Sequence, residues 1–333
     1  SSRRPDRRLD RCGRASRCSG PIDGRSVVVW GCDTPYDPTN QYIRPWVRAR
    51  AFDVQYTLEN VRRWLMTLFK RRRHDAGLAW SERTCRTPGG VELAVSVTEG
   101  RGDATLLMLP GFTSKRKNST NVEVAGSLAR LGVRCAAADL SGHGDSAGRI
   151  EDQTVSRAAT EVQTIVEFLR ESESGLFGLL GNSFSATAAI IACSNGAPVD
   201  ALGLKSPILD YVQMRSEQLG DERMALWRDS GTIKLDDGTP SHYDFIVDAE
   251  GLDVGEALAG LSIPVCAVHG GKDEQIPAAQ VARWDAEFAQ GRYEHAILRD
   301  GNHSLDGKYF GPMVHILKSF FTDRLLGLPT TLG

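Results

Sequence analysis

The sequence predicts an α/β fold, in which a mostly parallel central sheet carries helices on both faces. From residue 80 onward, short apolar runs alternate with longer stretches of helical periodicity, the pattern of repeated strand–helix–strand units. Polar turns with glycines follow these apolar runs, as at residues 139–146 and 181–185. Because ligands of parallel sheets bind at the carboxyl ends of the strands, these turns are where a functional site is expected.

The elements are expected in the following order. Alternating strands at 81–86 and 91–97 flank the turn Thr87–Gly90, which predicts a hairpin. Continuous apolar runs predict buried strands at 104–109, 133–139, 176–183, 201–205, 265–269 and 295–298. Periodic or small-residue stretches predict helices at 121–131, 155–171, 186–195, 278–289 and 310–326.

A basic extension, residues 1–75, is expected to precede a domain of residues 76–333. Residues 1–73 hold 17 Lys and Arg against 7 Asp and Glu, and since the whole chain has a net charge of −2, the rest is acidic. Apolar residues at three- and four-residue intervals predict an amphipathic helix at 53–73. For this helix, packing on its own domain is the first interpretation and binding to a membrane surface is the alternative. Residues 1–50 show little periodicity and are interpreted as a poorly packed leader, with a basic arm for an acidic partner as the alternative.

Composition excludes several classes of protein. The acidic body argues against nucleic acid as its partner. The seven cysteines form no CxxC pair, so neither a disulfide framework nor a zinc site is expected, and a cytoplasmic location is favoured. No apolar run approaches the length of a transmembrane segment. No metal-ligand spacing or glycine-rich phosphate loop occurs, so we expect no metal and no cofactor.

Ser183 is the candidate nucleophile. The apolar run Leu176–Leu180 leads into Gly181-Asn182-Ser183, and small residues follow. This pattern is typical of a strand-to-helix turn that exposes a serine hydroxyl. The usual last glycine of G-x-S-x-G is replaced by Ser185, for which we expect a packing role in the turn.

A serine nucleophile needs a base and a carboxylate that orients the base. In this architecture the chain order is Ser, then Asp or Glu, then His. Asp273 follows the strand at 265–269, with Glu274 as the alternative acid, and His303 follows the last strand. Asp139 and His143 precede the serine, so we interpret them as a hydrogen-bonded turn beside the site.

The negative charge that develops in acyl transfer needs fixed N–H donors. The backbone N–H of Phe184, directly after the serine, is one candidate. The second is the backbone N–H of Phe112, in the turn after the strand at 104–109. These two residues are therefore the predicted oxyanion hole.

Together these turns resemble the α/β-hydrolase superfamily over residues 80–327. The resemblance is carried by residues 110–113, 139–146, 181–185, 269–273 and 301–303. Gly142–Ser146 with residues 147–154 is similar to cinnamoyl- and feruloyl-type esterases. The Ser183-Phe184-Ser185 elbow and the His303 loop look more like the acyl-carrier-protein thioesterase of bacterial bioluminescence. The chain departs from the wider family at Pro110, where a His is usual, and at Ser185.

Residues 207–260 are too long for a plain connection between strands. The resemblance implies that this insertion forms a cap over the substrate pocket. Its large apolar side chains are either pocket walls or packing between cap and body, and the pocket candidates are Met214, Trp227, Tyr243 and Phe245.

The sequence therefore predicts a serine hydrolase that cleaves a small carboxylic ester or thioester through an acyl-enzyme. Ser183, Asp273 and His303 form its expected catalytic triad. Acyl transfer to an alcohol or amine, or acyl-carrier thioesterase activity, would use the same acyl-enzyme. A hydrolase fold used only for binding is the non-enzymatic alternative. A homodimer is compatible with the sequence.

Overall fold

The computed structural model describes residues 78–99, 103–172, 174–277, 279–280, 283 and 293–328. Its centre is an eight-stranded sheet of order β1-β2-β4-β3-β5-β6-β9-β10. The strands are β1 (Trp80–Arg86), β2 (Glu92–Thr98), β3 (Ala104–Met108), β4 (Arg134–Ala138), β5 (Leu176–Asn182), β6 (Ala201–Lys205), β9 (Val265–Gly270) and β10 (Tyr293–Leu298).

The sheet is parallel from β4 to β10. The β1–β2 hairpin pairs antiparallel, from Trp80 opposite Thr98 to Arg86 opposite Glu92, and β2 is antiparallel to β4. The other neighbouring strands run parallel. Consequently the carboxyl ends of β3, β4, β5, β6, β9 and β10 lie along one edge.

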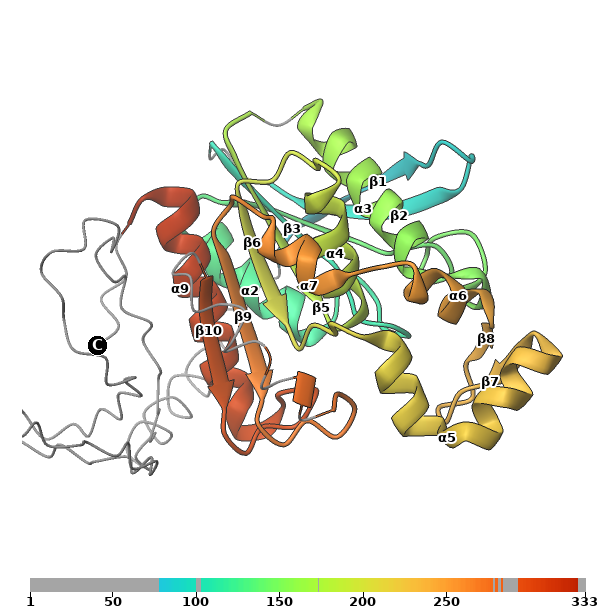
Figure 1. Ribbon diagram of the computed structural model, residues 1–333. Coiled ribbons are helices and arrows are strands. Elements are labelled where there is room, and N and C mark those ends of the chain that lie inside the picture. The colour runs from blue at the N-terminus through green and yellow to red at the C-terminus, as the bar shows by residue number, and fades with distance from the viewer. Residues whose placement is uncertain are drawn as a thin grey trace, which may run out of the picture. The chain divides into compact units, whose positions relative to one another are not determined.

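Helices cover both faces of the sheet (Figure 1). On one face lie α2 (Ser119–Ala129) and α9 (Phe310–Leu326), and on the other lie α3 (Val155–Arg170), α4 (Phe184–Ser194) and α7 (Val254–Ala259). Helix α9 approaches the sheet so closely that a Cβ at Gly203 would lie 2.7 Å from the Phe321 ring. Glycine in β6 therefore lets this buried aromatic ring pack directly on the backbone.

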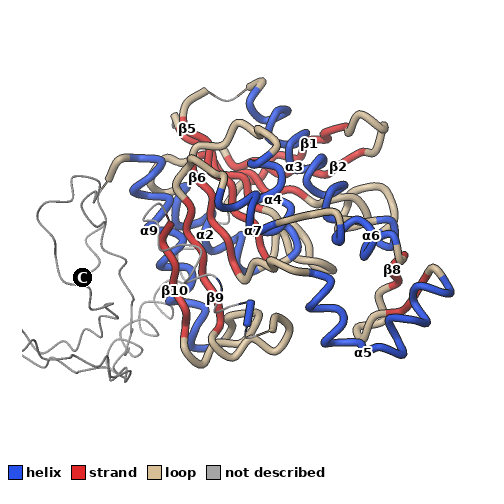
Figure 2. The backbone as a smooth tube through the Cα atoms, viewed as in Figure 1, coloured by secondary structure: helices blue, strands red, loops and turns tan. Residues whose placement is uncertain are grey.

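The insertion between β6 and β9 contains α5 (Tyr211–Ser230), β7 (Thr232–Lys234), β8 (Pro240–His242), α6 (Asp244–Glu250) and α7. Helix α5 begins close to the end of β6, and the Asp210 carboxylate caps it by accepting from Gln213 N at 2.8 Å. Gly220 interrupts it with a non-helical backbone, φ 71° and ψ 167°. As Figure 2 shows, the far part of α5 and the β7–β8 ribbon extend away from the sheet.

The predicted α/β architecture is confirmed, with element ends shifted by a few residues. Helix α4 begins at Phe184 rather than 186, because Ser183 itself is the residue that precedes the first turn. The basic extension, its helix at 53–73 and most of the helix at 278–289 lie outside the described residues. Among the helices described, none is long and apolar enough to cross a membrane.

Candidate active site

Ser183 lies in a strained turn between β5 and α4. Its backbone has φ 51° and ψ −112°, in the positive-φ region that non-glycine residues rarely adopt. Gly181 makes the turn possible, since a Cβ there would lie 2.5 Å from the Ala186 Cα. The tight turn thus places the Ser183 side chain at the carboxyl edge of the sheet.

Ser185 stabilises this turn through hydrogen bonds to its backbone. Its side chain is fully buried, and its hydroxyl accepts a hydrogen bond from Asn182 N at 2.9 Å and donates one to Asn182 O at 3.2 Å. The Asn182 side-chain amide donates to Leu109 O at 2.5 Å and Asn121 Oδ1 at 3.1 Å. The turn is therefore tied to the end of β3 and to α2.

Three side chains from separate loops form a hydrogen-bonded series. Ser183 Oγ lies 2.9 Å from His303 Nε2, and His303 Nδ1 lies 2.8 Å from Asp273 Oδ2. Because a carboxylate only accepts, Nδ1 carries the proton, and Nε2 is left to accept from the serine hydroxyl. The Asp273 side chain is 1% exposed and that of His303 is 9% exposed.

The surroundings of Asp273 favour its anion. Burial raises the pKa of Asp273, but the hydrogen bond and charge of His303, with the N–H groups of Ile276 and Gln275, lower it below the usual value. Both N–H groups donate to Asp273 Oδ1 at 2.9 Å. Backbone N–H groups therefore hold one carboxylate oxygen, Oδ1, in place, and the other oxygen, Oδ2, faces the imidazole of His303.

The backbone of His303 is also held by side chains. Its N–H donates to Glu274 Oε2 at 3.1 Å, and its carbonyl accepts from Lys205 Nζ at 3.2 Å and from Ser206 Oγ at 2.9 Å. Burial lowers the pKa of Lys205 to about 8, against the opposing charges of Asp273, Asp306 and Glu274. Glu274, the alternative acid, thus binds the backbone of His303, while Asp273 binds the ring.

Sequence reasoning missed Lys205 and Ser206. Both are polar residues that follow the apolar run of β6, and both are buried: Lys205 is 7% exposed and Ser206 is 0% exposed. A lysine at the carboxyl end of a buried strand was the available signal, since buried lysines usually have a specific partner.

The two predicted oxyanion donors lie at the start of α4 and in the loop after β3. In the described part of the chain, the backbone N–H groups of Phe112 and Phe184 donate to no protein acceptor. A Cβ at Gly111 would lie 3.5 Å from the Ser183 Cβ, so this loop is next to the serine. The rings of Phe112 and Phe184 also meet edge-on, with their centroids 5.3 Å apart.

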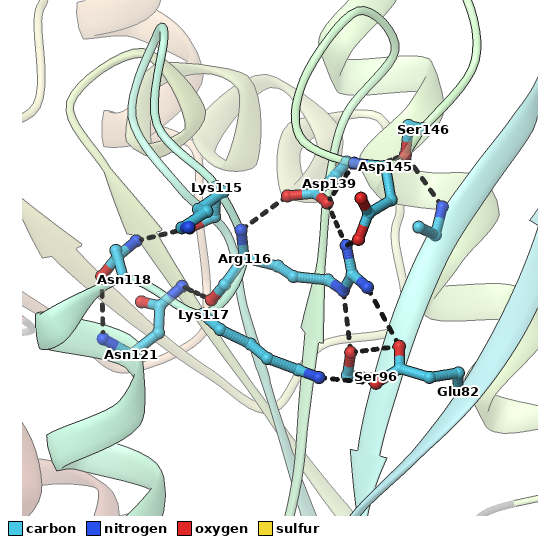
Figure 3. Close-up of polar contacts among 11 residues, drawn as sticks. Glu82, Ser96, Lys115, Arg116, Lys117, Asn118, Asn121, Asp139, Asp145 and Ser146 are labelled. Carbon is cyan, nitrogen blue, oxygen red and sulfur yellow. Dashed lines mark hydrogen bonds and ion pairs between the residues drawn. The ribbon is translucent and has the colours of Figure 1, made fainter.

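A buried network around Arg116 anchors the loop that carries Phe112 (Figure 3). The Arg116 guanidinium pairs with the fully buried Asp139, and donates to Ser96 Oγ at 2.7 Å and Glu82 Oε2 at 3.0 Å. The backbone N–H of Arg116 donates to Asp139 Oδ1 at 2.5 Å. This loop is therefore fixed to the end of β4 and to the β1–β2 hairpin.

The charges of this network are matched. Burial raises the pKa of Glu82, but hydrogen bonds from Lys117, Ser96 and Arg116 outweigh this effect and lower it to about 2. Burial opposes the charged form of Arg116, yet its bonds to Asp139, Asp145 and Glu82 raise its pKa above the ordinary value. Asp139 thus supports the loop rather than acting on the reacting atoms.

Aromatic rings surround the serine turn. The Phe184 ring contacts those of Phe112, His143, Tyr211 and Phe245, with centroids 5.3 to 6.4 Å apart. His143 donates from Nδ1 to Ser141 O at 3.0 Å, and burial lowers its pKa despite the nearby carboxylates. Its buried Nε2 is therefore an acceptor, and it has no partner among the described residues.

The predicted pocket residues separate into two groups. Phe245 is buried beside Phe184, and Met214 is buried in the first half of α5. The rings of Trp227 and Tyr243 instead contact each other, with their centroids 5.8 Å apart, and the Trp227 indole N–H donates to Ser241 O at 3.0 Å. No ring contact among the described residues links this pair to Phe184, and both contacts just named join residues of the insertion.

A cavity of about 540 Å³ is lined mostly by residues of the insertion. Its lining includes Val155, Asp210, Tyr211, Ala249 and Asp253, but not Ser183, Asp273 or His303. Tyr211 borders both this cavity and the Phe184 ring. No group of three His, Cys, Asp or Glu side chains within the described ranges could hold a metal ion.

The arrangement suits acyl transfer chemistry. A serine hydroxyl bonded to a neutral imidazole can be deprotonated as it attacks a carbonyl, and a buried carboxylate stabilises the imidazolium that forms. Two backbone N–H groups beside the serine can bind the resulting oxyanion.

Solved structures share this fold. Est1E from Butyrivibrio proteoclasticus, solved with ferulic acid bound, is 19% identical with a TM-score of 0.64, over 73% of this chain and 99% of its own. The protein called "Putative hydrolase from Agrobacterium vitis S4" is 20% identical with a TM-score of 0.63, over 73% of this chain and 98% of its own. Alpha/beta hydrolase domain-containing protein 10 from mouse is 21% identical with a TM-score of 0.60, over 73% of this chain and 97% of its own. No family model and no curated protein matches the chain.

The sheet order and the similarity to these solved structures show that the chain has the α/β-hydrolase fold. This is the fold that the resemblance of its turns predicted.

Proposed function

We propose that this protein is a serine hydrolase that cleaves a carboxylic ester or thioester through an acyl-enzyme. The observation that carries the proposal is the hydrogen-bonded series Ser183–His303–Asp273, with separations of 2.9 and 2.8 Å. These distances are within the range expected of a nucleophile, a base and an orienting carboxylate.

Each residue then has one role. Ser183 attacks the carbonyl while His303 Nε2 takes its proton, and His303 returns that proton to the leaving alcohol or thiol. Asp273 orients the imidazole and stabilises its charged form. The backbone N–H groups of Phe112 and Phe184 bind the oxyanion, each worth about 3 kcal/mol of transition-state stabilisation. Water, activated by His303, then releases the acyl group.

Support for ester chemistry also comes from the neighbours in fold, which include Est1E with ferulic acid bound. The insertion of residues 207–260 supports a cap role, because Tyr211 and Phe245 in it pack against Phe184. A reducing, cytoplasmic location is supported by four free thiols among the described residues, Cys85, Cys135, Cys193 and Cys266.

The proposal is tested with a fluorophosphonate probe and a panel of p-nitrophenyl esters and acyl thioesters of graded length. We expect the probe to label the wild type and not Ser183→Ala, and the kcat/KM of Ser183→Ala to fall by about 10⁴-fold or more. Labelling that persists in Ser183→Ala, or hydrolysis that survives it, would reject the role of this serine.

The same panel separates hydrolysis from acyl transfer. Products are analysed with and without an added alcohol or amine at a concentration that competes with water. Free acid alone supports a hydrolase, whereas a new ester or amide formed at the expense of acid indicates a transferase. Thioesters cleaved in preference to esters of the same acyl group would indicate a thioesterase.

A further inference from the structure

The first half of α5 spans the candidate active site. Near its start, the Tyr211 ring meets the Phe184 ring edge-on, with centroids 6.3 Å apart. Gln218 lies two residues before the break at Gly220. Its Nε2 donates a hydrogen bond to Gln275 O at 2.9 Å, and Gln275 belongs to the loop that carries Asp273. The helix thus reaches from the serine turn to the loop of the acid.

Arg215 lies between these two contacts. It is four residues after Tyr211 and three before Gln218, so the three share one helix face. Its guanidinium carbon lies 6.0 Å from the centroid of the Phe245 ring, which itself contacts Phe184. Two successive contacts, through the Phe245 ring and then the Phe184 ring, therefore connect the cation to the serine turn.

The Arg215 guanidinium lacks an anionic partner. Its Nη1 donates to the neutral Gln218 Oε1 at 2.8 Å, while its Nε is buried and makes no hydrogen bond within the described ranges. None of the carboxylates described lies within ion-pair distance of it. Those that act on it from further away are Asp236 and Asp237, and Asp236 already pairs with Arg223 at 2.7 Å.

An unpaired cation in this position is costly. Burial lowers the pKa of Arg215, although the Tyr211, Asp237 and Asp236 groups oppose the shift, and arginine stays charged in proteins. Buried charges are ordinarily paired, because desolvation is not otherwise offset. By contrast, the buried Arg116 and the partly buried Arg157 and Arg170 bind carboxylates.

We propose that Arg215 is a specificity-determining residue that binds a negatively charged group, a carboxylate or a phosphate, on the ester or thioester substrate. The inference rests on the proposed hydrolase function. A guanidinium presents paired donors that match either anion, and the face of Phe245 covers one side of it. The anion would complete the charge pairing that the protein leaves open, so anionic substrates gain binding energy there.

The test compares matched substrates. In the first pair, p-nitrophenyl valerate is compared with the mono-p-nitrophenyl ester of glutaric acid, which places a carboxylate on the acyl group. In the second, the butyryl thioester of N-acetylcysteamine is compared with butyryl-coenzyme A, which places phosphates on the leaving group. We expect the wild type to prefer the anionic member of one pair by at least about tenfold in kcat/KM.

Arg215→Gln should abolish most of that preference, chiefly by raising KM, while hydrolysis of the neutral member persists. Arg215→Lys should retain part of it. Arg228→Gln, which removes the same charge from an exposed side chain in the second half of α5, is the matched control and should behave as the wild type. An unchanged preference in Arg215→Gln, or a wild type that favours neither anion, overturns the inference.

Direct binding separates this inference from the proposed function. The amide analogue of the glutarate ester, N-(4-nitrophenyl)glutaramate, is titrated calorimetrically against each variant. Binding that weakens about tenfold in Arg215→Gln and not in Arg228→Gln supports the anion site even without turnover. Ser183-dependent hydrolysis of neutral esters with no anion effect in either assay rejects the anion site and leaves the hydrolase proposal standing.

Discussion

At the scale of single residues, the serine turn stores strain that its neighbours hold in place. Ser183 has a positive φ of 51°, a conformation that costs a non-glycine residue free energy and persists only when its surroundings fix it. Here the fixing groups are polar. Ser183 N donates to Lys205 O at 2.7 Å, and the Ser185 hydroxyl bonds both the N–H and the carbonyl of Asn182.

The Ser185 hydroxyl is therefore expected to stabilise the turn. Ser185→Ala leaves the buried Asn182 N–H without its acceptor, at a cost of about 1–3 kcal/mol in the free energy of unfolding. Urea denaturation measures the loss. Ser194→Ala, an exposed serine at the end of the same helix, is the control and should change stability by less than about 0.5 kcal/mol. Equal stability of the two variants would contradict this role.

Residue-level prediction from the sequence is possible for positions in the turns after strands. The sequence predicts Ser183, Asp273 and His303 because each comes after an apolar run, and the structure places these three side chains within hydrogen-bond distance of one another. The supporting residues Lys205, Ser206 and Arg215 were not found. Their partners are a backbone carbonyl 98 or 97 residues away, or an aromatic ring in another element, and no local spacing indicates such contacts.

At the scale of elements, the loop between β3 and α2 depends on one buried ion pair. Asp139 is fully buried, and Arg116 is its cationic partner. Arg116→Gln leaves that carboxylate uncompensated, so we expect a loss of about 3–5 kcal/mol in the free energy of unfolding. Since the loop also carries the Phe112 N–H, kcat should fall in protein that remains folded. Denaturant titration and steady-state kinetics measure the two effects.

Lys117→Gln is the control for Arg116→Gln. Lys117 is the next residue and also binds Glu82, at 2.5 Å, but both side chains are partly exposed. Exposed ion pairs are worth at most about 1 kcal/mol, so this variant should keep nearly all its stability. Similar losses in the two variants would mean that burial of the Arg116–Asp139 pair does not determine the strength of the anchor.

At the scale of the whole molecule, the order of strands and helices was predictable because its pattern repeats, whereas the shape of the insertion was not. Apolar runs and periodic stretches identify the elements of the sheet and its covering helices one by one. In the insertion, α5 contains a glycine break and β7 and β8 have three residues each, too short for a periodic signal. Its aromatic residues divide between Phe184 and internal packing, which periodicity cannot distinguish.

The protein as a whole should lose stability as the pH falls below about 6.5, and its buried histidines determine where the loss begins. Burial, reinforced by the charge of His295, lowers the pKa of the fully buried His269 from 6.5 to about 3. Between these values the unfolded chain binds a proton that the folded chain does not. The free energy of unfolding therefore rises with pH in this window, by up to about 1.4 kcal/mol per pH unit for one such group, and is constant above it.

Other groups add to this dependence with the same sign. The pKa of Glu82 is lowered from 4.5 to about 2, so its stabilising contribution is complete above 4.5 and is lost as the pH falls toward 2. We therefore expect a plateau between pH 6.5 and about 8, where Lys205 begins to titrate, a decline below pH 6.5 and a steeper decline below 4.5. Urea denaturation from pH 4 to pH 8 measures the curve. His269→Gln, whose amide can still donate to Pro207 O, should flatten the decline between pH 4.5 and 6.5 by about one proton. An identical slope in this variant would assign the acid sensitivity to other groups.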